Sequence, residues 1–145
     1  MKIKQLSVFL ENKPGQLVLP CRLLGEAGIN ILNLSLADTQ QFGILRLLVK
    51  DWRQAKSILE ENDCVVNVTE VVAVSAPYKP GGLANVLQAL EDGGINVEYM
   101  YAFPCNPGED GVLIFRFEEP DKAVEALKAA NIQMVEAEDL YARVE

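Results

Sequence analysis

The spacing of apolar residues along the chain changes in a regular order. Leu6, Val8 and Leu10 recur at every second position, with polar residues at 5 and 7, and a period of two predicts a half-buried strand. From Leu17 to Gly28 the apolar and small residues recur at intervals of three and four, which predicts a helix that ends at a glycine. Residues 32–36 alternate again, so a second strand follows the helix.

The change of period continues to about residue 68. A turn beginning at Asp38 precedes a strand at 44–49, and Asp51 is a suitable N-cap for a helix that runs to about Asn62. Residues 64–68 then form a fourth strand. The order β-α-β-β-α-β is that of the ferredoxin-like fold.

This pattern is present twice. The stretch KPGQLVLPCRLLGEAGINIL, from Lys13, aligns without a gap with KPGGLANVLQALEDGGINVE, from Lys79. Lysine, proline, glycine, two leucines and the Gly-Ile-Asn triplet coincide, so the chain contains an internal duplication. In the second copy, strands are expected at 71–76, 95–103, 112–117 and about 133–137, and helices near 83–92 and 121–130.

We therefore predict an α+β chain of two ferredoxin-like βαββαβ domains, with antiparallel sheets and helices on one face. The expected domains are residues 1–70 and 71–145. The final segment, Leu140 to Val144, has no role that the repeat predicts.

Each copy places Pro-Gly where its first helix begins. The first N–H groups of a helix lack internal partners and the helix dipole adds partial positive charge, so a small anion can bind there. Gly15 and Gly81 remove the side chain that would block close approach, while Pro14 and Pro80 restrict the turn. The alternative is a simple strand-to-helix turn that binds nothing. Pro20, in the first copy alone, either delays the helix start or distorts its first turn.

An asparagine follows Gly-Ile at the start of the second strand in both copies, at Asn30 and Asn96. An amide both donates and accepts hydrogen bonds, so it can bind the ammonium of a free amino acid while a helix N-terminus binds the carboxylate. Alternatively, the amide is satisfied by the backbone of its own turn. Tyr99, Tyr101 and Phe103 share one face of a strand, where they either line a pocket for an aromatic or imidazole side chain or pack into the core.

Composition excludes several classes of function. Half of the 145 residues are hydrophobic, but no apolar run is long enough for a membrane span or a signal peptide, so a cytoplasmic protein with no membrane partner is expected. The net charge is −8, and all of the acidic excess lies after Glu70. No nucleic acid is expected as a partner, because phosphate contacts need lysine and arginine.

The chain also lacks the residues on which much catalysis depends. It contains no histidine, and its cysteines, Cys21, Cys64 and Cys105, are far apart and form no CxxC motif. Histidine-assisted nucleophilic catalysis is therefore excluded, and a zinc site has almost no support. We expect no catalytic residues, no cofactor and no metal.

These motifs resemble those of ACT domains, the amino-acid-sensing modules of metabolic enzymes. KPGQL with GIN and KPGGL with GIN, repeated on one βαββαβ order, look like a small tandem ACT protein without an attached catalytic domain, and the resemblance covers nearly the whole chain. It implies domains that pair through strands and bind an amino acid where the loop after the first strand faces a partner domain. In such domains one asparagine lies two residues before the proline and another follows the Gly-Ile turn. The first copy has both, Asn12 and Asn30, whereas the second has Asn96 but Tyr78 in place of the first.

By this resemblance, the expected function is that of a non-catalytic regulatory module that binds a free amino acid at the interface between ACT domains. A homodimer is expected, with a metabolic enzyme as a further candidate partner. The alternative is a ligand-independent interaction or regulatory subunit of such an enzyme. The expected ligand-binding residues are Asn12, Lys13, Pro14, Gly15, Gln16, Leu17, Asn30, Ile31, Tyr78, Gly81, Gly82, Leu83, Ile95 and Asn96.

Overall fold

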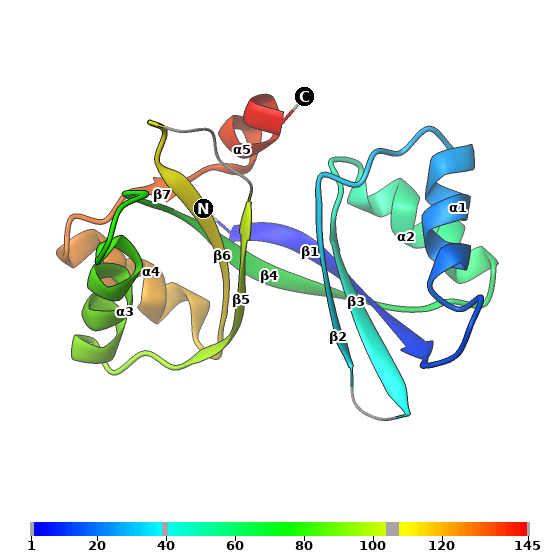
Figure 1. Ribbon diagram of the computed structural model, residues 1–145, viewed down its shortest axis with the longest axis horizontal. Helices are drawn as coiled ribbons and strands as arrows, with labels where there is room; N and C mark the ends of the chain where they lie inside the picture. The colour runs from blue at the N-terminus through cyan, green and yellow to red at the C-terminus, as the bar shows by residue number, and fades with distance from the viewer. Residues whose placement is uncertain (1, 39–40, 104–107, 145) are drawn as a thin grey trace. The chain divides into compact units, whose positions relative to one another are not determined.

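The computed structural model of the protein describes residues 2–38, 41–103 and 108–144 (Figure 1). They form two compact units. The first unit is Lys4–Thr69, and the second unit consists of the chain from Glu70 onward together with the first residues of the N-terminal strand.

The first unit contains one βαββαβ set. Its elements are β1 (Lys2–Glu11), α1 (Val18–Glu26), β2 (Asn33–Asp38), β3 (Phe42–Leu48), α2 (Trp52–Glu61) and the first half of β4 (Val65–Ala76). The strands are ordered β4-β1-β3-β2, and β3 runs antiparallel to both of its neighbours. This is the predicted ferredoxin-like topology.

Both helices of the first unit cover the same face of its sheet (Figure 1). Leu24 of α1 and Leu59 of α2 are fully buried against alternate residues of β1 and β3. Leu6 lies opposite Leu47 in the antiparallel register, so the two side chains project from one face. The apolar residues that recur with a period of two in the strands and with a helical period in the helices therefore form a single core.

The second unit repeats this arrangement. Its elements are the second half of β4, α3 (Gly82–Asp92), β5 (Val97–Phe103), β6 (Gly111–Phe117), α4 (Pro120–Ala129), β7 (Met134–Val135) and α5 (Ala137–Val144). The strand order is β7-β4-β6-β5, since β7 pairs with β4 at Ala73 and Val74. The two strands expected at 64–68 and 71–76 form one strand, β4, which contributes to both units.

Leu90 of α3 and Leu127 of α4 cover one face of this second sheet. Phe115 and Phe117 project from the same face and stack with ring centroids 5.3 Å apart. Both rings are fully buried, which contributes about 1.5–3 kcal/mol for each side chain. The predicted fold class is confirmed in both units.

The end of the chain differs from the expected pattern. The strand expected at 133–137 is shorter, because only Met134 and Val135 pair with β4, and Ala137 already begins α5. Leu140 and Tyr141 of this helix are buried, and burial raises the pKa of the Tyr141 hydroxyl. Two residues of the C-terminal segment are therefore buried, while Ala142 and Arg143 stay exposed.

The first residues of β1 join the second unit through an ion pair. Lys2 Nζ lies 2.9 Å from Asp121 Oδ1 at the start of α4 and 3.8 Å from Glu70 Oε2. The hydrogen bond and the charge of Asp121 raise the pKa of Lys2. The ion pair therefore favours the charged form of Lys2.

The starts of the equivalent helices α1 and α3 differ by two residues in the repeat. Helix α3 begins at Gly82, which aligns with Gln16, whereas α1 begins only at Val18. Pro20 then occupies the third helical position, where a backbone N–H would have no partner inside the helix. Of the two effects considered for Pro20, the structure has the delayed start.

Asp51 caps α2 as predicted, since its side chain accepts a 3.2 Å hydrogen bond from the Gln54 N–H. We expect Asp51→Ala to lower the free energy of unfolding by about 0.5–2 kcal/mol, because this N–H loses its acceptor. Asp51→Asn should lower it by a few tenths of a kcal/mol at most, since asparagine caps equally well. Urea denaturation of the three proteins measures both changes, and equal stability of the alanine variant would contradict the assignment of the cap.

Candidate functional site

The two Pro-Gly turns share an unusual backbone conformation. Gly15 has a φ of +90° and Gly81 a φ of +87°, in the left-handed region that favours glycine. A Cβ atom at either position would meet nothing within 4 Å in the protein. The backbone conformation therefore requires glycine here, and the expected reason, close approach of another group, has no counterpart within the chain.

Gly82 is crowded instead. A Cβ atom built on it would lie 2.0 Å from the carbonyl oxygen of Pro77. The Gly82 N–H donates to the Lys79 carbonyl at 3.0 Å, and the Lys79 N–H donates to the Pro77 carbonyl at 2.9 Å. This folded-back turn brings the end of β4 against the start of α3, and the first repeat has Gln16 at the equivalent position.

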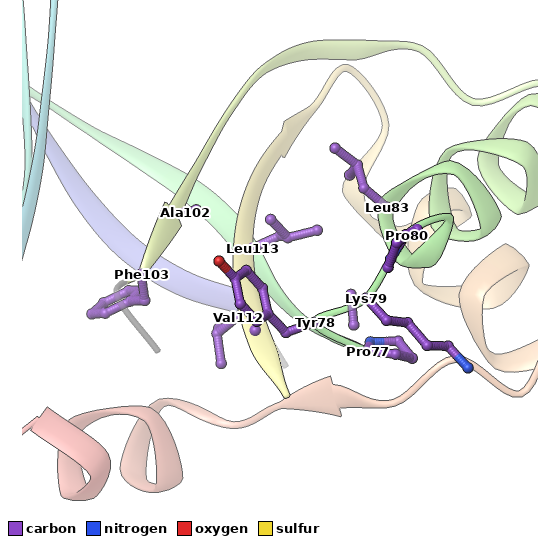
Figure 2. A pocket seen from close by; sticks show the side chains of 11 residues that line it. Pro77, Tyr78, Lys79, Pro80, Leu83, Ala102, Phe103, Val112 and Leu113 are labelled. Atoms are coloured by element: carbon purple, nitrogen blue, oxygen red, sulfur yellow. The ribbon is translucent and has the colours of Figure 1, made fainter. Parts of the chain in front are cut away.

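An apolar pocket of about 500 Å³ opens beside this turn in the second unit (Figure 2). It lies where the end of β4, the start of α3, the end of β5 and the start of β6 meet. The lining residues are Ala76, Pro77, Tyr78, Lys79, Pro80, Leu83, Ala102, Phe103, Gly111, Val112 and Leu113. Its volume falls within the range of small-molecule sites.

The strand register brings these positions together. Gly111 pairs with Ala76 on one side of β6, and Leu113 pairs with Ala102 on the other. Because paired residues project from the same face, Ala76, Ala102 and Leu113 form the floor beneath the start of α3. Figure 2 shows the Tyr78 ring in front of β6 near Leu113, with Pro80 and Leu83 beside α3. The Tyr78 side chain is 74% exposed, so its ring forms an outer wall.

The electrostatic surroundings of the pocket favour an anion. Lys79 is the one charged residue of the lining, and Figure 2 shows its side chain extending away from Tyr78. Helix α3 begins at this edge without a side-chain cap and without an acidic residue in its first turn. The Gly82 N–H already donates to the Lys79 carbonyl, which leaves the N–H groups of Leu83 and Ala84 at the end of the helix where the helix dipole is positive.

The residues predicted for the second repeat are only partly brought together. Tyr78 and Leu83 line the pocket, whereas Gly81 and Gly82 shape the turn behind it. Ile95 and Asn96 follow the other end of the eleven-residue helix α3, which is about 16 Å long. In the second unit, therefore, Asn96 does not share one site with the Pro-Gly turn.

The same separation holds in the first unit. Asn12, Lys13, Pro14, Gly15 and Leu17 are exposed, and Gln16 is half-buried. The Asn12 N–H donates to the Gln41 carbonyl at 3.0 Å, which anchors the turn to the start of β3. Asn30 is exposed and Ile31 half-buried beyond the far end of α1, a nine-residue helix about 14 Å long.

Some pocket residues were not predicted from the sequence. Phe103 lines the pocket and is also buried, so it fits both interpretations of the aromatic strand, while Tyr99 and Tyr101 are not among the lining residues. Ala76 and Ala102 lie outside the KPGGL and GIN motifs, so the motifs did not identify them. Their signal lies in the comparison of the repeats, where leucine stands at both equivalent positions.

The two described cysteines, Cys21 and Cys64, are free. Burial and the charge of Asp63 raise the pKa of the Cys64 thiol, so this group is a poor source of thiolate. Cys105 lies outside the described residues. Within the described ranges, no three residues of the types His, Cys, Asp and Glu are grouped as metal ligands.

No helix in the part of the chain that the structure describes is both long and apolar enough to cross a membrane.

Comparisons with known proteins agree with the fold. A family model described as an ACT domain pair matches residues 1–144. A protein of known structure from Bacteroides thetaiotaomicron is 41% identical, with a TM-score of 0.91 and coverage of 97% of this chain and 96% of that chain. The ligand-free regulatory subunit of aspartate kinase from Thermus thermophilus is 18% identical, with a TM-score of 0.63 and coverage of 88% and 91%, which shows similarity of fold alone. No curated protein matches the chain.

We expect Gly82→Ala to lower the free energy of unfolding by about 1–3 kcal/mol, because the added Cβ meets a backbone oxygen that cannot rotate away. Gly25→Ala in α1 is the matched control, since its Cβ would meet nothing within 4 Å. Removing a helical glycine there should raise stability by about 0.5–1 kcal/mol. Opposite signs in urea denaturation support the folded-back turn, and two stabilising changes would refute it.

Proposed function

Because this chain belongs to the family of ACT domain pairs, we propose that it is a non-catalytic regulatory module that binds a free amino acid. The observation that carries the proposal is the apolar pocket beside the Pro-Gly turn of the second unit. It combines a cavity of suitable volume with an uncapped helix N-terminus, which are the two parts that an amino acid needs for its side chain and its carboxylate.

The proposed binding mode places the carboxylate at the N–H groups of Leu83 and Ala84, in the first turn of α3, and the side chain in the pocket. Pocket lining residues supply no acidic side chain for the ammonium. Asn30 and Asn96 have suitable amides, but each lies at the far end of the helix from the turn of its own unit. We therefore propose that a second copy of the chain supplies the amide, so that the ligand completes its contacts at an interface between ACT domains.

Regulation follows from this arrangement by linkage. A ligand that contacts two copies binds the associated state more tightly than the separate chains, so it shifts the equilibrium toward association. A change in association can then be transmitted to an enzyme that binds the module. The similarity to the regulatory subunit of aspartate kinase is one of fold, and we propose no particular enzyme.

We also propose that two copies associate through β2. This strand is the last in the order of the first sheet, so one of its edges faces away from β3. Leu34 and Leu36 on β2 are about half exposed, at 49% and 50%, and Phe42 on the neighbouring β3 is 60% exposed. An apolar edge strand of this kind is a template for pairing with another chain. The same surface supports the second candidate function, that of a ligand-independent interaction subunit.

A thermal-shift screen of the purified protein against the twenty amino acids tests the proposed ligand. One amino acid or a few related ones should raise the Tm, because a ligand at a hundred times its Kd stabilises by about 2.7 kcal/mol. Asn96→Ala and Asn30→Ala should each be tested for a reduced shift, with Asn85→Ala on the exposed side of α3 as the control. A screen without any shift at millimolar concentrations would reject amino acid binding and leave the interaction subunit.

Sedimentation velocity tests the association. The wild-type protein should form a dimer that Leu34→Lys dissociates, because a lysine on the edge strand opposes strand pairing. Val65→Lys is the matched control, since Val65 is 63% exposed on β4, which lies inside the strand order rather than at its end. Equal sedimentation of both variants and the wild type would reject pairing through β2.

A further inference from the structure

We infer that the pocket of the second unit selects amino acids with a large apolar side chain, and that two alanines, Ala76 and Ala102, create the room for it. The inference rests on the proposed function and deepens it by naming the ligand class and the unit that binds it. It comes from a comparison of equivalent positions in the two sheets.

The two repeats align these alanines with leucines. Without a gap, Ala76 aligns with Leu10 and Ala102 aligns with Leu36. The strand pairing supports the same equivalence, since Leu10 lies opposite Gly43 as Ala76 lies opposite Gly111.

The pairing of the edge strand in each sheet shows the same equivalence for Leu36 and Ala102. Leu36 lies opposite Leu45, and Ala102 lies opposite Leu113. The two sheets therefore have the same geometry at these positions and differ in the side chains that they carry.

The replacement of leucine by alanine leaves more room above the sheet of the second unit. An alanine side chain ends at Cβ, whereas a leucine extends by three further carbons over the same face of the sheet. In the first unit these carbons lie where the second unit has the floor of its pocket. Ala102 and Ala76 approach the floor from strands on opposite sides of β6, so together they widen it across the whole strand end.

Outside the floor, the second unit carries larger side chains than the first unit at two equivalent positions. Tyr78 stands where the first unit has Asn12, and Phe103 stands where it has Ala37. The second unit thus combines a floor of small residues with the exposed ring of Tyr78 at the rim, while Phe103, next to Ala102 on β5, lines the end of the pocket from the other face of the sheet (Figure 2). Aromatic rings pack well against apolar and aromatic groups.

The chemistry of the lining then defines the ligand class. Apart from Lys79 and the Tyr78 hydroxyl, the lining side chains have no polar group, so a polar ligand side chain would lose its water without gaining hydrogen bonds. Phenylalanine, leucine and methionine meet both requirements, an apolar side chain and a carboxylate for the start of α3. Serine, aspartate and glycine do not.

Isothermal titration calorimetry of the full chain with phenylalanine, leucine and serine tests this inference, together with Ala102→Leu. Ala102 is exposed on the terminal strand β5, and the fold carries leucine at the equivalent position, so the variant should keep its structure. We expect phenylalanine or leucine to bind the wild type in preference to serine. Ala102→Leu should weaken that binding about tenfold or more, because the added carbons fill the pocket floor.

Ala129→Leu is the matched control, since it makes the same exchange at an exposed alanine on α4, outside the pocket lining and away from β2, and should leave the Kd unchanged. Circular dichroism and the Tm without ligand establish that each variant is folded. Ala76→Leu provides a second, independent way to fill the floor. Weaker binding by Ala102→Leu, with unchanged binding by Ala129→Leu, supports the inference.

The inference and the proposed function fail in distinguishable ways. Unchanged binding of phenylalanine or leucine by folded Ala102→Leu and Ala76→Leu would overturn the pocket assignment and leave amino acid binding in place. Preference for serine or another small polar amino acid would overturn the ligand class. Absence of binding for all twenty amino acids would overturn both proposals together.

Discussion

The burial of one face of each sheet beneath two helices is the constraint on which the structure depends. A four-stranded sheet exposes too much apolar surface to be stable alone, and the helices remove one face of it from water. In each unit the helices must return across the sheet between strands, so each begins near one strand end and finishes near the other. This geometry places the helix N-terminus, the preceding turn and the ends of three strands at one corner, where the pocket of the second unit lies.

Because the chain is duplicated, the backbone and side chains of one unit can be compared with those at the equivalent positions of the other. The Pro-Gly turns keep the same left-handed glycine, because that conformation connects strand to helix in both units. Around that shared conformation the two corners differ. Pro20 delays α1 in the first unit, while Gly82 permits an earlier and tighter start of α3 in the second. The repeat therefore conserves the path of the chain and varies the space beside it.

The two corners also differ in what they expose. In the first unit, leucines occupy the strand ends and half of their surface faces solvent at Leu36, which suits contact with another protein surface. In the second unit, alanines leave a cavity with an uncapped helix start beside it. The proposed roles, association for the first unit and ligand binding for the second, account for both patterns, because a domain pair needs only one site to link ligand to association.

The sequence by itself determined the duplication, the βαββαβ order and the fold class, since periods of two and of three to four depend only on local geometry. It also identified Asp51 as a cap and singled out the glycines of both turns, although the reason it gave was close approach of a ligand and the structure gives a left-handed backbone. Element ends were less certain: β7 is shorter than expected because strand length depends on pairing with β4, and α5 was not predicted at all. The site required the tertiary structure, because a pocket forms from residues that are distant in sequence. Only the register of β4, β5 and β6 brings Ala76 and Ala102 to one floor, and only the length of the helices separates the two predicted parts of a site within one unit.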